Sequence, residues 1–369
     1  MTSNLPPVIA IVAKIMAADA GRVRAETLLQ IQGADPVYVR RHLGAIDAAL
    51  GTASPGLASL TALVDQAEDA VSTSRPTVDV QHVTSQVVLR KSVEDVPPHG
   101  RVLARYDLTG RAIRQLELTG TNGVGYINNF VPVDSQATED LWQHVEGRLN
   151  PALAAARNGT VLGNPTHLST LRGAVALHFV RNPQTLTAHN ESFAGAIDRH
   201  VDQAAQTPLA AQAFLDKHGL YPAGPDALRL GAEALVERLA KLHQEGGLFR
   251  LSVQRLFEKA CDRFDVRGVE ILTPASAGKE FLLGDVPAIT IDQAGTYGIS
   301  HGVTVDNAQK IVMPLTPRLL VAIGPQDGAR MITDDEVDAY NMMQVREARE
   351  YVIYRPGANF AADIAAWRT

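Results

Sequence analysis

The order in which helical and extended segments follow one another constrains the fold most. Five short extended segments succeed each other over residues 268–324 without a helix pattern between them. A long helical stretch precedes them, and residues 334–354 predict one final helix with an apolar end. A doubly wound parallel sheet would need regular alternation of strand and helix, which this chain lacks. We therefore predict an α+β fold with a mixed or antiparallel sheet and a large helical middle section.

Earlier in the chain, the sequence of residues 100–118 predicts a β-hairpin. Apolar and polar residues alternate on both sides of the turn sequence Asp107-Leu108-Thr109-Gly110. In the helical middle, an amphipathic helix begins near residue 135 and ends at Gly159, and a more buried helix ends before Pro183. Further helices are expected over residues 184–205 and 225–262.

A polar joint at residues 72–79, STSRPTVD, marks a domain boundary. We predict an N-terminal helical extension over residues 1–75 and a main α+β body over residues 80–369. Within the extension, a helix, a short glycine turn and a second helix with Arg40 and Arg41 also fit a helix-turn-helix. The surrounding segment is nearly neutral, so a plain helical bundle is the favoured interpretation.

Length and composition limit the class of protein. The chain has 369 residues, more than the roughly 250–300 residues at which a single core stops growing. Its net charge of -6 argues against a protein coated for nonspecific nucleic-acid binding. Cys261 is the single cysteine, so no intrachain disulfide can form, and we expect a soluble protein of the reducing cytoplasm. The sequence predicts neither a signal peptide nor a membrane span.

Asp285 is the first candidate for a functional residue. It follows an apolar run, EFLLG, and precedes Pro287 and a long glycine-containing loop over residues 293–309. One interpretation is an Asx-turn, in which the carboxylate binds the backbone two residues later. The other places the carboxylate at a strand end beside the loop, where loops often cover sites.

Seven short motifs, in this order, resemble a bacterial domain-of-unknown-function family, the one numbered 4238. The resemblance covers residues 82–354 and leaves the N-terminal helices outside. This chain departs from the family pattern at His82-Val83-Thr84-Ser85, where the family usually has His-Tyr-Val-Pro, and at Gly284-Asp285-Val286-Pro287, where it usually has Ser-Asp-Asn-Pro. The motifs that carry the resemblance are HVTSQVVLRK, NNF, LWQHVEGRL, HFVRNP, FLLGDVP, MPLTPRL and YNMMQVREAREYVIY.

The shared pattern implies that His82, Glu146 and Asp285 converge as catalytic residues. One imidazole and two carboxylates would suit a divalent metal such as Mn²⁺, Fe²⁺ or Zn²⁺, whose bound water could attack an ester or phosphodiester. The alternative is that His82 is a hydrogen-bonded core residue without a metal.

Arg90 and Arg181 are expected to bind an anionic ligand or to serve a structural role. Arg181 ends a buried helix, where a guanidinium is commonly paired with a carboxylate, and Glu146 is the expected partner. In that alternative, the same residues form a buried polar network without catalysis.

Three functions therefore remain open. The first is a hydrolase, metal-assisted in one form, that acts on a phosphoester or nucleic acid. The second is a noncatalytic ligand-binding or regulatory protein with a structural network of His, Glu, Arg and Asp. The third and weakest is DNA binding through the N-terminal helices.

Overall fold

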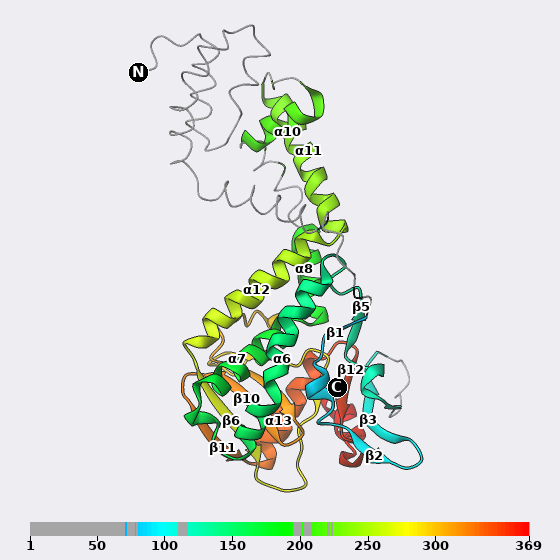
Figure 1. Cartoon of the computed structure of the whole chain (residues 1–369), viewed down its shortest axis with the longest axis vertical. Coiled ribbons are helices and arrows are strands. Elements are labelled where there is room, and N and C mark those ends of the chain that lie inside the picture. The colour runs from blue at the N-terminus through cyan, green and yellow to red at the C-terminus, as the bar shows by residue number, and fades with distance from the viewer. Residues whose placement is uncertain are drawn as a thin grey trace. The chain divides into compact units, whose positions relative to one another are not determined.

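The computed structural model describes residues 71, 78, 80–109, 117–194, 201, 205, 208–219, 222 and 224–368 (Figure 1). The chain divides into two compact units, which are described separately below. The first contains Met1–Ser74 and His189–Leu251, and the second contains Arg75–Ala188 and Ser252–Thr369. The expected N-terminal extension and its helix-turn-helix alternative lie outside the described residues, apart from Val71.

A mixed five-stranded sheet in the order β11-β6-β10-β9-β8 forms the centre of the second unit. β6 pairs antiparallel with β10 and parallel with β11. Every residue of β10 is buried, as expected for a strand that is covered on both faces. The strands are β6 (Gly268–Pro274), β8 (Ile289–Ile291), β9 (Lys310–Thr316), β10 (Leu319–Gly324) and β11 (Gly328–Ile332).

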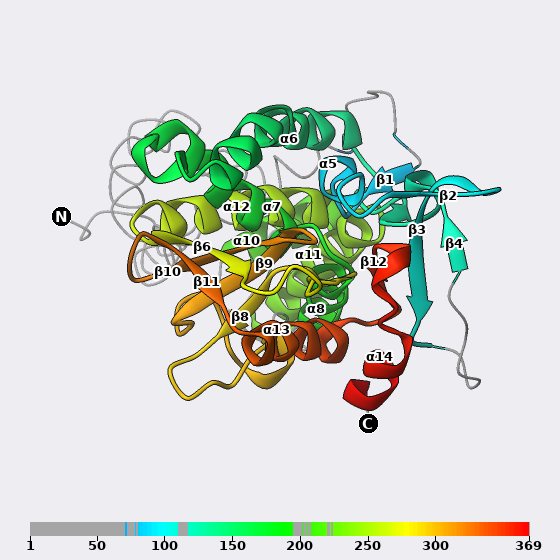
Figure 2. The ribbon, with the colours of Figure 1, turned by 90° about the horizontal axis from the view of Figure 1, so that it is seen from below.

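Helices lie on both faces of this sheet (Figure 2), with α7 (Pro165–Val180) on one side and α13 (Asp334–Glu347) on the other. Leu320 and Ala322 of β10 share a core cluster with Val337 of α13. The residue between them, Val321, faces the opposite side because successive side chains of a strand alternate. The alternation thus gives each helix its own apolar surface on the sheet.

A second sheet joins segments that are far apart in the sequence. Its order is β2-β3-β12-β7, and β4 pairs with β3 outside that path. β12 lies antiparallel to β3, with Tyr351 opposite Asp107, and Tyr354 packs in one cluster with Ile364 of α14. The elements are β2 (Glu94–Val96), β3 (Gly100–Asp107), β4 (Glu117–Thr119), β7 (Leu283–Gly284), β12 (Tyr351–Tyr354) and α14 (Ala361–Arg368).

Two long helices and a small strand pair carry the candidate residues. α6 (Ser135–Arg157) ends just before Gly159, whose φ is +71°, and packs on α7. α7 begins with Pro165, and the Asn164 side chain accepts hydrogen bonds from two backbone N–H groups of its first turn, which satisfies donors that the helix leaves free. β1 (Val80–His82) pairs with β5 (Tyr126–Asn128), and α5 (Gln86–Leu89) follows β1.

The described part of the first unit is helical. It contains α10 (Pro208–His218), α11 (Pro225–Gln244) and parts of α8 (Pro183–Ala194) and α12 (Gly247–Asp265). α10 and α11 approach so closely that a Cβ at Gly231 would overlap the carbonyl of Ala210. The ring of His243 stacks on Phe193 with 4.0 Å between the ring centroids.

The predicted α+β class is confirmed, while several boundaries differ. β3 and β4 pair antiparallel as predicted, although residues 110–116 of the connection lie outside the described residues. The helix predicted over residues 225–262 is in fact two helices, because the chain turns at Gly246 with φ +83°. β11, β12 and α14 were not predicted. Among the described helices, none has the length and apolar character needed to cross a bilayer.

Candidate functional site

Arg181 follows α7 directly and is the most deeply buried charged group of the candidate site. Its side chain is 2% exposed, and Nη1 donates a 2.8 Å hydrogen bond to Oε1 of Glu146 on α6. The guanidinium carbon also lies 4.3 Å from the ring centroid of Trp142, an arrangement that favours a cation–π interaction. The predicted pairing of Arg181 with Glu146 is therefore confirmed.

One face of α6 supplies the acidic side of the site. Glu139, Trp142 and Glu146 are three and four residues apart, so helical geometry places them on the same face. Glu139 interacts electrostatically with both Arg181 and Glu146. Two carboxyl groups therefore share one buried guanidinium.

His178 attaches α7 to the segment that follows β1. Its side chain is 1% exposed, and Nε2 accepts a 3.0 Å hydrogen bond from the backbone N–H of Ser85. Nδ1 must then carry the proton, which it donates to the carbonyl of Ala174 at 2.7 Å. Burial lowers the pKa of His178 to about 4, so the imidazole is neutral and structural at pH 7.

His82 ends β1 and is half-buried near the same groups. The side-chain amide of Gln86 donates to the carbonyl of Thr121 at 2.8 Å and lies 3.1 Å from Nδ1 of His82. Burial lowers the pKa of His82, and Arg181 lowers it further against the opposing effect of Glu146. His82 is therefore a neutral imidazole at pH 7.

The pKa of Glu139 is shifted in the opposite direction from that of His82. Burial raises its pKa, and the neighbouring Glu146 adds to the effect while Arg181 opposes it.

Among the described residues, three buried polar atoms of this cluster have no hydrogen-bond partner: Gln86 Oε1, Glu139 Oε1 and Arg181 Nε. Buried polar atoms without protein partners are common where a ligand or water completes a site.

Asp285 lies in a different environment. It is 2% exposed, and its two carboxylate oxygens accept hydrogen bonds from the backbone N–H groups of Arg349 and Glu350, each at 2.8 Å. The Asx-turn interpretation is wrong, because these donors come 64 and 65 residues later in the chain. Burial raises the pKa of Asp285 to about 6, although the two N–H groups act in the opposite direction. Asp285 ties β7 to the segment that leads into β12.

The structure brings only some of the predicted residues together. His82 interacts electrostatically with Glu146, Arg181 and Arg90, and Arg90 is exposed at the end of α5. Across the residues that the structure describes, no three His, Cys, Asp or Glu side chains gather so that they could hold a metal ion. His82, Glu146 and Asp285 are thus not grouped as ligands of one ion.

Glu139 and Trp142 were not predicted as site residues from the sequence. Both precede Glu146 in the amphipathic helix that was predicted, at helical spacings of seven and four residues. A search for polar residues on the same face as Glu146 would have found Glu139.

Comparison with known proteins gives one match. Residues 80–358 match the model of the family described as "Protein of unknown function (DUF4238)". No curated protein and no solved structure matches the chain.

Proposed function

Because the chain belongs to the DUF4238 family, whose description names no activity, we propose a function from its own site: an acid–base hydrolase of phosphoesters. The observation that carries this proposal is the pair of carboxyl groups, Glu139 and Glu146, on one face of α6 beside the buried Arg181. A buried carboxyl group with a raised pKa next to a carboxylate that is held by a cation is an arrangement that acid–base pairs use.

In this proposal, Glu146 is the base and Glu139 is the acid. Oε1 of Glu146 is held by Arg181, while Oε2 has no hydrogen-bond partner among the described residues and can accept a proton from water. The water oxygen attacks phosphorus, and the bond from phosphorus to the leaving oxygen breaks. Glu139, whose protonated form is favoured because burial raises its pKa, gives its proton to that oxygen.

The cationic groups make an anionic ester the expected substrate class. Arg181 and Arg90 both interact electrostatically with His82, and Glu146 offsets part of their positive charge. The free Nε of Arg181 is an additional donor for a phosphoryl oxygen. His82, held by Gln86, would position the substrate as a neutral hydrogen-bonding group.

Hydrolysis of bis(p-nitrophenyl) phosphate tests this proposal. Glu139→Gln and Glu146→Gln should each lower kcat by about 10²–10⁴-fold, the usual contribution of a positioned acid or base. Glu191→Gln, which removes a charge at an exposed position of α8, is the matched control and should retain activity. The rate should fall as the pH rises through the elevated pKa of Glu139. Absence of turnover by the unmodified protein across pH 4–9 would refute this substrate class.

A metal-assisted form of the hydrolase would need His82, Glu146 and Asp285 to share one ion; the described side chains do not gather in that way, so we do not propose this form. Elemental analysis of the purified protein tests it. Near-stoichiometric transition metal that is lost in Asp285→Ala would support this form. A metal-free protein whose melting temperature ignores added Mn²⁺ would exclude it.

The second candidate is a noncatalytic ligand-binding protein in which the same residues form a structural network. The hydrogen bond from Arg181 to Glu146 and the ring of Trp142 against the guanidinium favour it. In that case Glu139→Gln and Glu146→Gln change the stability of the protein, and neither the variants nor the unmodified protein hydrolyse phosphoesters. The stability cycle at the start of the Discussion separates the two candidates.

A further inference from the structure

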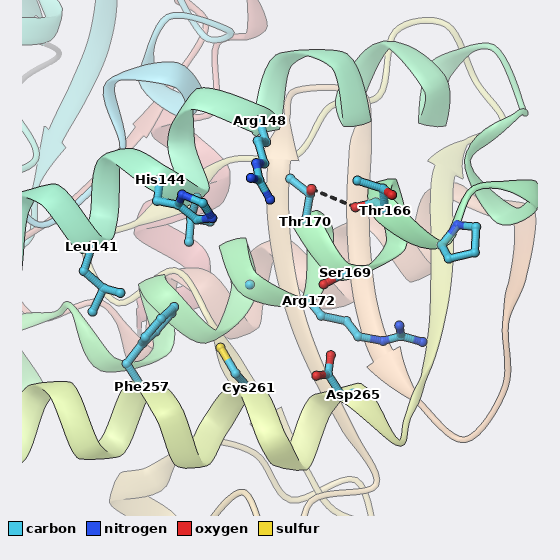
Figure 3. Close-up of a pocket in the computed structure, with 13 residues that line it drawn as sticks. Leu141, His144, Arg148, Thr166, Ser169, Thr170, Arg172, Phe257, Cys261 and Asp265 are labelled. Atoms are coloured by element: carbon cyan, nitrogen blue, oxygen red, sulfur yellow. Dashed lines mark hydrogen bonds between the residues drawn. The ribbon is translucent and has the colours of Figure 1, made fainter.

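A cavity of about 510 Å³ lies among α6, α7 and α12, within the second unit (Figure 3). Its volume falls within the range of small-molecule sites, roughly 300–1,000 Å³. The α6 residues that line it, such as His144 and Arg148, differ from those that surround Arg181, so this is a separate site. It involves none of the residues of the proposed hydrolase.

The α6 wall of the cavity is basic and has free donors. His144 and Arg148 are four residues apart, which places both on the face toward the cavity (Figure 3). Neither side chain has a hydrogen-bond or ion-pair partner among the described residues. On α7, Arg172 is held in place by the carbonyl of Arg267, at 2.9 Å from Nε and 2.6 Å from Nη2.

The total charge of the lining favours an anion. Two arginines and one aspartate, Asp265, line the cavity, so arginine side chains outnumber carboxylates in its lining. The first turn of α7 also faces it through Pro165 and Thr166, and Ser169 follows in the next turn. Because the N-terminus of a helix carries a partial positive charge, this end of α7 adds to the attraction for a negative group.

The other surface of the cavity is apolar. Leu141 and Val145 of α6 and Phe257 of α12 line it together with the half-buried Cys261. Figure 3 shows Leu141 and Phe257 at one end of the cavity and Ser169 and Arg172 toward the other. A ligand that fills this space therefore needs an apolar body as well as a charged head.

We propose that this cavity binds an amphipathic anion, a small molecule with a carboxylate or phosphate-monoester head and an apolar body. Arg148 and His144 hold the head by charge-assisted hydrogen bonds, and the hydroxyl of Ser169 lies within the same lining. Leu141, Val145 and Phe257 cover the apolar body.

The chain's single cysteine provides a direct reporter for this site. Because Cys261 is the one thiol in the sequence, alkylation by iodoacetamide measures the accessibility of the cavity alone. Burial raises the pKa of the Cys261 thiol to about 11, with Asp265 contributing, so alkylation is best followed near pH 9. Cys261→Ser, which cannot be alkylated there, gives the background.

The probes are decanoate and decyl phosphate. Decanol, which has the apolar body without a charged head, and inorganic phosphate, which has the charge without the apolar body, are the controls. We expect decanoate or decyl phosphate to slow alkylation at least tenfold, and the preferred one identifies the head group. Decanol and inorganic phosphate should slow it less than twofold at the same concentration. Equal protection by decanol, or none by either anion, would overturn the proposal.

Two arginine variants on α6 test the role assigned to Arg148. Arg148→Gln should weaken the binding of the protecting anion about tenfold. Arg157→Gln removes the same charge from an exposed position of the same helix outside the cavity and should bind it normally. Melting temperatures without ligand establish that both variants fold. Unchanged affinity in Arg148→Gln would contradict the assignment.

Discussion

If Arg181 and Glu146 belong to a structural network, breaking their ion pair should destabilise the protein strongly. Arg181 is 2% exposed and Glu146 19%, and 2.8 Å separates Nη1 from Oε1. Glu146→Gln keeps the size of the side chain while removing its charge, so the buried guanidinium loses the carboxylate that accepts its hydrogen bond. Arg181→Met removes the guanidinium and its contact with Trp142, which lies 4.3 Å from the guanidinium carbon.

Removing one partner of a buried pair typically costs about 3–5 kcal/mol, because the remaining charge is buried without compensation. For a protein unit of this size, each kcal/mol lowers the melting temperature by about 2–4 °C. Each single variant should therefore melt roughly 6–20 °C below the unmodified protein. The double variant leaves no unpaired charge, so its loss should be well below the sum of the single losses.

Thermal and urea unfolding of the four proteins in this cycle measures the interaction energy. The more exposed pair between Lys279 and Asp338, with side chains 31% and 35% exposed, serves as a matched control. The cycle of Lys279→Met with Asp338→Asn should give only about 0.2–1 kcal/mol. Small, additive losses at Glu146 and Arg181 would refute the structural network and favour groups held in a wet cleft for a ligand.

Two further predictions concern pH. The pKa of His178 is about 4 in the folded protein, against 6.5 for an ordinary histidine. As the pH drops, the unfolded chain therefore takes up this proton before the folded protein does, and the free energy of unfolding falls between pH 6.5 and pH 4. His178→Gln should remove up to about 3 kcal/mol of this acid sensitivity in urea unfolding series; an identical pH profile in the variant would contradict it. The pKa of Asp285 is about 6 in the folded protein, against an ordinary 3.8. The folded protein thus holds this proton more tightly than the unfolded chain, so the stabilising effect of the protonated carboxyl group is full below pH 3.8 and is lost as the pH rises through 6. The stability difference between the unmodified protein and Asp285→Asn should shrink over that range, and a difference that grows would refute the assignment.

The elements that could be predicted from the sequence are those with strong local signals. α6 and α7 were predicted from apolar periodicity and from the proline and glycine at their ends. β9 and β10 are continuous apolar runs next to a short connection, which is typical of buried strands. The four-residue β12 was missed because Tyr351–Tyr354 directly follows the helix pattern and pairs with residues that precede it by more than two hundred positions.

The site could be predicted only in part, for a related reason. The pairing of Arg181 with Glu146 followed from the general need of a buried guanidinium for a carboxylate. The partners of Asp285 could not be inferred, because they are backbone N–H groups of Arg349 and Glu350, and every residue carries such a group. Local turn chemistry therefore gave the wrong answer for Asp285.

The position of β12 has a consequence for biosynthesis. Of the described strands it is synthesised last, yet it lies between β3 and β7 in its sheet. Until the ribosome releases Tyr351–Tyr354, both neighbouring strands present unpaired edges, and such edges attract other chains. The second sheet can therefore close only after residue 354 has been synthesised, and a nascent chain stalled before residue 351 should need a chaperone to stay in solution.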